Sequence, residues 1–196
     1  MAEDTFFKLV WPPGIERRSA EWREEVGRAI AEVCGKLNKQ PEELSKDDRF
    51  LDAISRATAA ALKDHRRERW ELLRIGLVNS ALPPPLDEDL QQVFFQFLDE
   101  LTLTHIAMLK AIDSPYDPAV AGISTVEFVK RRLGKTVTDE PMLRAFLDQL
   151  EARRLLQSSS PRTPVGAGPF GQTSFTGMGK RFLAFVSKSD ERPVVG

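Results

Sequence analysis

The sequence is poor in the residues that build disulfides, metal centres and catalytic pairs. Its 196 residues include one cysteine, Cys34, and two histidines, His65 and His105. A single cysteine excludes an internal disulfide, and a lone thiol on a helical pattern usually fills space in a core. Neither histidine has metal-ligand spacing, and neither forms a recognisable pair with a nucleophile. We predict no metal, no cofactor and no enzymatic activity, although clustered carboxylates leave an acid/base pair open.

Complete nucleotide-binding motifs are also missing. Gly166–Gly171 fits the pattern G-x-G-x-x-G, but no βαβ pattern surrounds it and Pro169 removes a backbone donor. Gly134–Thr136 resembles the end of a P-loop, but the first glycine of that motif would fall at Val129. Neither stretch predicts a nucleotide site.

Long apolar runs are absent as well. The segment Met1–Val10 has neither the apolar region nor the small-residue cleavage site of a secretion signal. No uncharged run approaches the length that crosses a bilayer. We therefore expect a cytoplasmic protein that does not contact a membrane, with enough apolar residues, 41%, for an ordinary core.

The net charge is only −1, which alone would disfavour a nucleic-acid partner, but the charges are unevenly distributed. Residues 1–70 hold 14 basic and 14 acidic residues, residues 71–120 hold 2 and 8, and residues 121–196 hold 12 and 7. The three segments therefore carry 0, −6 and +5. This pattern suits a basic end that faces an anionic partner, and equally an acidic surface that pairs with a basic one.

Apolar residues recur at helical spacing along most of the chain. An apolar stub at Phe6–Trp11 precedes them, which could be an edge strand or an arm docked on a partner. The polar run Lys63–Arg69 indicates a solvated helical stretch or a short break. The expected helices begin near Ser19, at Ser45 or Asp47, before Trp70, at Asp87, at Thr102 or Thr104, at Ser124, at Thr136 or Thr138, and at Thr176.

The helix expected to begin at Thr136 or Thr138 has its apolar face over Leu143–Leu156, and the other elements of the C-terminal half follow from it. The order there is helix, short strand, loop, returning strand and helix, with the loop between Gln157 and Ser174. Together, Met142–Leu156 and the T-x-x-G-x-x-F-L stretch Thr176–Leu183 resemble the winged helix-turn-helix of bacterial regulators over about 103–186. We predict a mainly α protein with an N-terminal helical bundle over 1–101. A C-terminal winged helix with a small β wing would follow over 102–187, and a tail over 188–196.

The winged-helix resemblance implies an interface with double-stranded DNA. In such families the third helix enters the major groove, which would place Arg144, Ala145, Asp148 and Gln149 near bases. The end of the second helix and the wing lie near the phosphate backbone, where basic side chains displace counterions. The residues concerned are Lys130, Arg131, Arg132, Lys135 and Arg162.

A second resemblance covers roughly 66–113. Arg69–Ser80 followed by Phe97–Leu109 is similar to the helical core of bacterial abortive-infection alpha-type proteins, which implies phage defence and supplies no catalytic residues. Our leading hypothesis is a non-enzymatic, DNA-associated bacterial regulator whose helical part self-associates, for example as a dimer. Phe95 lies off its helical stripe and could meet a neighbouring helix or a second subunit. The interaction residues would be Phe95, Phe6, Phe7 and Trp11. The alternative is a protein–protein interaction module of a bacterial defence system that does not bind DNA.

Overall fold

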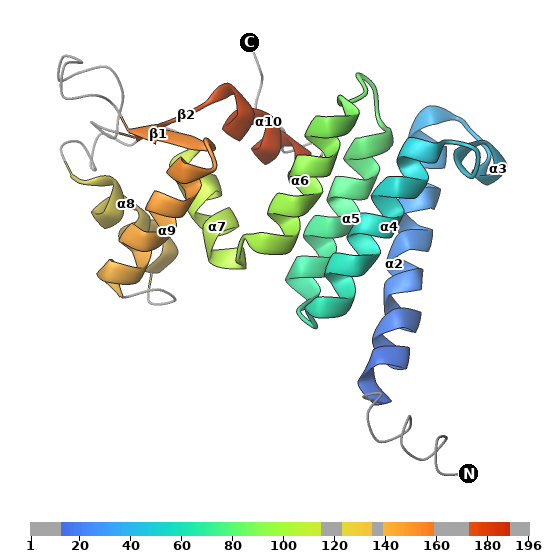
Figure 1. The fold of residues 1–196 in the computed structure, drawn as a ribbon, viewed down its shortest axis with the longest axis horizontal. Helices are drawn as coiled ribbons and strands as arrows, with labels where there is room; N and C mark the ends of the chain where they lie inside the picture. The colour runs from blue at the N-terminus through green and yellow to red at the C-terminus, as the bar shows by residue number, and fades with distance from the viewer. Residues whose placement is uncertain (1–12, 115–122, 135–138, 159–172, 189–196) are drawn as a thin grey trace. The chain divides into compact units, whose positions relative to one another are not determined.

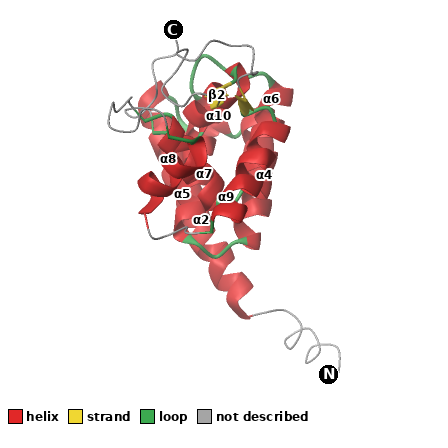
Figure 2. Ribbon diagram, turned by 90° about the vertical axis from the view of Figure 1, so that its left-hand side faces the viewer, coloured by secondary structure: helices red, strands yellow, loops and turns green. Residues whose placement is uncertain are grey.

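The computed structural model describes residues 13–114, 123–134, 139–158 and 173–188. These residues are mainly helical, which confirms the predicted class, and two short strands are the only extended elements among them (Figures 1 and 2). The chain divides into two compact units. The first comprises residues 1–100 together with 185–190, and the second comprises 101–184 together with 191–196.

Among its described residues, the first unit is a bundle of four main helices and one short helix (Figure 1). Helix α5 packs against α2, α4 and α6, and α4 also contacts α2 and α6. The helices are α2 (Pro13–Leu37), α3 (Pro41–Leu44), α4 (Asp48–Lys63), α5 (Arg67–Ala81) and α6 (Glu88–Glu100).

Side-chain caps fix several of these helix starts. The Asp47 carboxylate accepts hydrogen bonds from the amides of Arg49 and Phe50 and so begins α4, and Asp87 does the same for α6. Both caps agree with the sequence prediction. Helix α2 does not, because it begins at Pro13 and not after Ser19. Proline suits a first helical turn, where the amides have no helical partner.

Two tryptophans occupy the core of the bundle. Trp22 on α2 and Trp70 on α5 are each 1% exposed, and their rings meet edge to face with centroids 6.2 Å apart. Each indole N–H is satisfied: Trp22 Nε1 donates to Thr58 Oγ1 at 2.9 Å, and Trp70 Nε1 donates to the carbonyl of Asp64 at 2.8 Å. The bundle therefore buries two large aromatic groups without leaving their polar atoms unpaired.

The polar run between α4 and α5 is a break and not a continuous helix. Asp64 receives hydrogen bonds from the backbone amide and the guanidinium of Arg66. The expectation of a solvated stretch is wrong for Arg69, which is 4% exposed and donates from Nη1 to the carbonyl of Leu98 at 2.7 Å. Arg69 also forms an ion pair with Asp64, with 3.5 Å between Nε and Oδ2, and the carboxylate balances the buried positive charge.

A short C-terminal segment completes the first unit. Asn79 on α5 donates from Nδ2 to the carbonyls of Phe185 and Ser187, at 2.8 and 2.9 Å. The Phe185 ring lies 5.3 Å from the rings of both Phe94 and Phe95. At Gly76 an added Cβ would come within 3.0 Å of Phe185 Cε1, so the small residue lets the ring approach α5.

The second unit contains four helices and a two-stranded ribbon among its described residues. Helix α7 contacts α8 and α9, and α9 contacts β1. The elements are α7 (Leu103–Ile112), α8 (Thr125–Leu133), α9 (Glu140–Ala152), β1 (Leu156–Ser158), β2 (Thr173–Phe175) and α10 (Gly177–Phe185), the last residue of which belongs to the first unit. The strands are antiparallel, with Leu156 opposite Phe175.

Helix α7 starts with a reciprocal cap. The Thr102 hydroxyl accepts from the His105 amide, and His105 Nδ1 accepts from the Thr102 amide at 3.1 Å. Thr102 is one of the two predicted starts for this helix. The His105 ring is 1% exposed and lies 4.1 Å from the ring of Phe146 on α9, so the cap also ties α7 to α9.

The predicted helix over Leu143–Leu156 is shorter in the structure. It ends at Ala152, and Arg154 turns the chain with φ of 57°. Leu155 and Leu156 stay buried, but as part of the turn and of β1. Apolar spacing alone does not distinguish a helix that continues to Leu156 from a turn followed by a strand, because two adjacent leucines suit either a helix end or the start of a buried strand.

The T-x-x-G stretch connects α10 to this turn. Thr176 Oγ1 accepts from the Gly179 amide at 2.9 Å and donates to the carbonyl of Arg154, and the Thr176 amide donates to the Leu155 carbonyl at 3.2 Å. A Cβ at residue 179 would lie 1.9 Å from the Leu155 carbonyl oxygen. Only glycine permits this approach, so the motif has a structural explanation.

Candidate nucleic-acid interface

The basic residues at the end of α8 form the main candidate interface. Ser124, the predicted start of this helix, caps it by accepting from the Glu127 amide at 3.2 Å. Val126, Phe128 and Val129 are buried and orient the helix. The last turn then presents Lys130, Arg131 and Arg132, where cations also interact favourably with the helix dipole.

The two arginines of this group are exposed and weakly held. Arg131 Nε pairs with Glu127 Oε1 at 2.9 Å, one turn earlier on the same helix. The Arg132 guanidinium lies 5.5 Å from the centre of the Phe128 ring. An exposed ion pair of this kind contributes only about 0.3–0.5 kcal/mol, so a phosphate can displace Glu127 at little cost. Lys130 is half-buried.

The outward side of α9 carries both signs of charge. Arg144 and Gln149 are exposed, as the predicted interface requires, but so are Glu140 and Asp148. Arg144 Nη2 lies 2.7 Å from Glu140 Oε1. The hydrogen bond from Arg144 and its charge lower the pKa of Glu140, and the charge of Lys130 adds to this. Glu140 therefore stays ionised and opposes the approach of a phosphate to this helix.

Several predicted site residues are not part of this arrangement. Lys135, Arg162, Phe6, Phe7 and Trp11 lie outside the described residues. Phe95 is 2% exposed and packs edge to face against Phe185 within the first unit. The expectation that Phe95 serves self-association is therefore corrected: of the two alternatives for this ring, the contact within the chain is the one observed.

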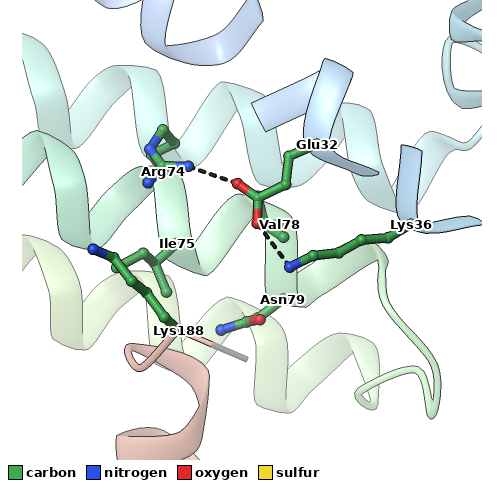
Figure 3. Close-up of a pocket in the computed structure, with 7 residues that line it drawn as sticks. All are labelled: Glu32, Lys36, Arg74, Ile75, Val78, Asn79 and Lys188. Carbon is green, nitrogen blue, oxygen red and sulfur yellow. Dashed lines mark hydrogen bonds and ion pairs between the residues drawn. The ribbon is translucent and has the colours of Figure 1, made fainter. Parts of the chain in front are cut away.

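A second polar site, which sequence reasoning missed, lies in the first unit. Glu32 on α2 bridges Lys36 of its own helix and Arg74 of α5, beside a small pocket (Figure 3). The spacing of Glu32 and Lys36 is visible in the sequence as an i,i+4 pair. No local signal identifies Arg74 or Lys188, because they come from α5 and from the C-terminal segment.

Metal-binding clusters and membrane-spanning helices are absent from the described part of the chain. No group of three or more histidine, cysteine, aspartate or glutamate side chains could hold a metal there. None of its helices is both long enough and apolar enough to span a membrane. Comparisons of the chain with protein-family models, with curated proteins and with solved structures found no match.

Proposed function

We propose that the second unit is a winged helix that associates with double-stranded DNA, chiefly through phosphate contacts from the end of α8. The observation that carries this proposal is the set of three consecutive cations, Lys130–Arg132, held on a capped helix directly before α9. The order of three helices and an antiparallel ribbon supports the fold assignment. The loop that would form the wing lies outside the described residues.

The charges on α9 limit the kind of DNA binding that we propose. Arg144 and Gln149 can reach base edges in a major groove, but Glu140 and Asp148 on the same helix repel phosphates. Binding should therefore depend more on the backbone than on the base sequence. Such binding weakens steeply with salt: the logarithm of the binding constant falls with the logarithm of the salt concentration, with a slope of about −0.9 per neutralised phosphate.

An anisotropy titration with a labelled duplex between 50 and 200 mM salt, in the range where such binding changes strongly, tests this proposal. The double variant Arg131→Gln/Arg132→Gln removes two proposed contacts, so we expect weaker binding and a salt slope that is smaller by about 1.8. The variant Glu127→Gln frees Arg131 from its ion pair and should bind more tightly than the wild type.

The matched control is Arg17→Gln/Arg28→Gln on α2. These arginines are exposed and also pair with carboxylates one turn away. The control also removes two positive charges, so it has the same net charge as the double variant on α8. We expect the control to bind nearly as the wild type does. Equal losses in both double variants, or no salt-dependent binding by the wild type, would contradict the proposal.

The alternative function is a protein–protein interaction module of a bacterial defence system, as the resemblance of 66–113 implies. The exposed carboxylates Glu140 and Asp148 favour it, because a surface of mixed charge suits a protein better than a polyanion. Under this alternative the duplex does not bind at any salt concentration.

A further inference from the structure

A small polar pocket in the first unit is bounded by three elements. Lys36 and Glu32 come from α2, Arg74 and Asn79 from α5, and Lys188 from the C-terminal segment (Figure 3). Ile75 and Val78 supply its apolar wall. The volume is about 120 Å³. This is room for about four water molecules and is well below the several hundred Å³ of a site for a drug-sized ligand.

The lining is dominated by cations. Three cations, Lys36, Arg74 and Lys188, and one carboxylate, Glu32, line the pocket, which gives the lining a formal charge of +2. Lys36 and Arg74 contact Glu32, whereas Lys188 does not (Figure 3). Two further carboxylates lie outside the lining: Glu71, 2.9 Å from Lys188 Nζ, and Glu25, 3.8 Å from Arg74 Nε. These partners hold the cations in place, and an anion that enters the pocket competes chiefly with Glu32.

Arg74 has hydrogen-bonding capacity that the described residues do not use. Its side chain is 20% exposed, and its one hydrogen bond to a described residue runs from Nη1 to Glu32 Oε2 at 2.8 Å. A guanidinium has five N–H donors in a planar fork that matches the oxygens of carboxylate and phosphate. A half-buried guanidinium with spare donors favours a ligand or water that accepts from them.

The Glu32 carboxylate shows how an oxyanion is held here. One of its oxygens accepts from Lys36 Nζ at 2.7 Å and the other from Arg74 Nη1. Burial acts to raise the pKa of Glu32, but the hydrogen bonds and charges of Lys36 and Arg74 outweigh it and lower the pKa. The same two cations can stabilise a second anion, and Lys188 adds a third positive group from the C-terminal segment.

We propose that this pocket binds a small oxyanion, with Arg74 as the anchor and with Lys36 and Lys188 as flanking cations. The volume selects inorganic phosphate or a short carboxylate, or the terminal group of a larger molecule that remains outside. Asn79 contributes no free amide proton toward the anion, because its Nδ2 donates to Phe185 and Ser187. Its role is to hold the segment that carries Lys188.

The test is a titration of the full chain with inorganic phosphate at constant ionic strength, followed by the amide NMR signals of α2, α5 and residues 185–188. We expect the amide chemical shifts of α2, α5 and residues 185–188 to change and to saturate as phosphate is added. Arg74→Gln should weaken binding about tenfold or more, since it removes charge-assisted hydrogen bonds. Lys188→Gln, which removes a largely exposed cation, should weaken binding less. Glu32→Gln should strengthen binding, because the competing carboxylate is lost.

Arg56→Gln is the control variant. Arg56 is also a partly exposed arginine that pairs with a carboxylate, Asp52, but it lies on α4 away from the pocket lining. Its phosphate affinity should equal that of the wild type. Parallel titrations with acetate and with a nucleoside monophosphate distinguish a carboxylate, a free phosphate and a tethered phosphate. The proposal would be overturned if none of the three anions produced saturable chemical-shift changes. It would also be overturned if the wild type, Arg74→Gln and Lys188→Gln bound phosphate with equal affinity.

Discussion

The two units close their cores by different means. The first relies on large side chains: Trp22 against Trp70, and Phe185 against Phe94 and Phe95. The second depends at one point on close backbone approach, where Gly179 lies against the Leu155 carbonyl. A side-chain core can relax around a small change, whereas two backbones in contact have no rotamer to adjust. The second unit should therefore be more sensitive to the addition of a single methyl group.

The largest expected effect is that of Gly179→Ala. The new Cβ would lie 1.9 Å from the Leu155 carbonyl oxygen, so the start of α10 must move. We expect the second unit to lose about 3 kcal/mol or more of its free energy of unfolding. Amide hydrogen exchange in α7 and α9 measures this. Trp22 and Trp70 lie in the first unit, and their fluorescence should change little.

Gly177→Ala, two residues earlier in α10, is the matched control for this prediction. A Cβ at residue 177 meets no atom within 4 Å, so the variant should be close to neutral. If both alanine variants unfold at the same denaturant concentration, the contrast between the two cores is wrong.

A smaller loss is expected in the first unit for Asn79→Ala. The change removes both hydrogen bonds to the C-terminal segment and leaves the carbonyls of Phe185 and Ser187 without this donor. We expect a loss of about 2–3 kcal/mol, measured by urea unfolding with tryptophan fluorescence. Ser80→Ala is the control, since the Ser80 hydroxyl donates only to Leu77 in its own helix. A loss no larger than that of the control would show that side-chain packing alone holds the segment.

The smallest effect concerns pH and the break between α4 and α5. The hydrogen bond from the Arg66 guanidinium lowers the pKa of Asp64; burial acts against this shift, and the charges of Arg66 and Arg69 add to it. Because the folded pKa is below the unfolded one, the ionised carboxylate stabilises the fold above the unfolded pKa of about 3.9. This contribution is lost as pH falls toward the folded pKa.

The variant Asp64→Asn should therefore unfold more easily than the wild type at pH 6, and the difference should shrink below pH 4, near the unfolded pKa. Urea midpoints by tryptophan fluorescence provide the measurement. A difference that does not change with pH would mean that Asp64 acts through hydrogen bonding and not through its charge.

Local features of this fold were predictable, and distant contacts were not. The caps at Asp47, Asp87, Thr102 and Ser124 follow from short spacings, because each side chain reaches an amide two or three residues ahead. The burial of Arg69 does not follow from the sequence, because its partner, the Leu98 carbonyl, is 29 residues away. A carbonyl has no sequence signature.

The candidate interface shows the same division. The three cations of α8 could be named from the sequence, since they are consecutive on a helix with a clear start and end. The polar pocket could not, because its cations come from α2, α5 and a segment more than 100 residues beyond α5. The T-x-x-G stretch is visible in the sequence, but the need for glycine at residue 179 depends on the position of the Leu155 backbone.

The C-terminal segment that Asn79 holds has a consequence for folding during synthesis. The first unit needs Phe185, which emerges from the ribosome 85 residues after Glu100. At about 5–20 residues per second, this delay lasts about 4–17 s. During that time Phe94 and Phe95 lack the ring that covers them. The nascent bundle therefore exposes an apolar surface until Phe185 has emerged, and during this delay the chain is most open to aggregation or to capture by a chaperone.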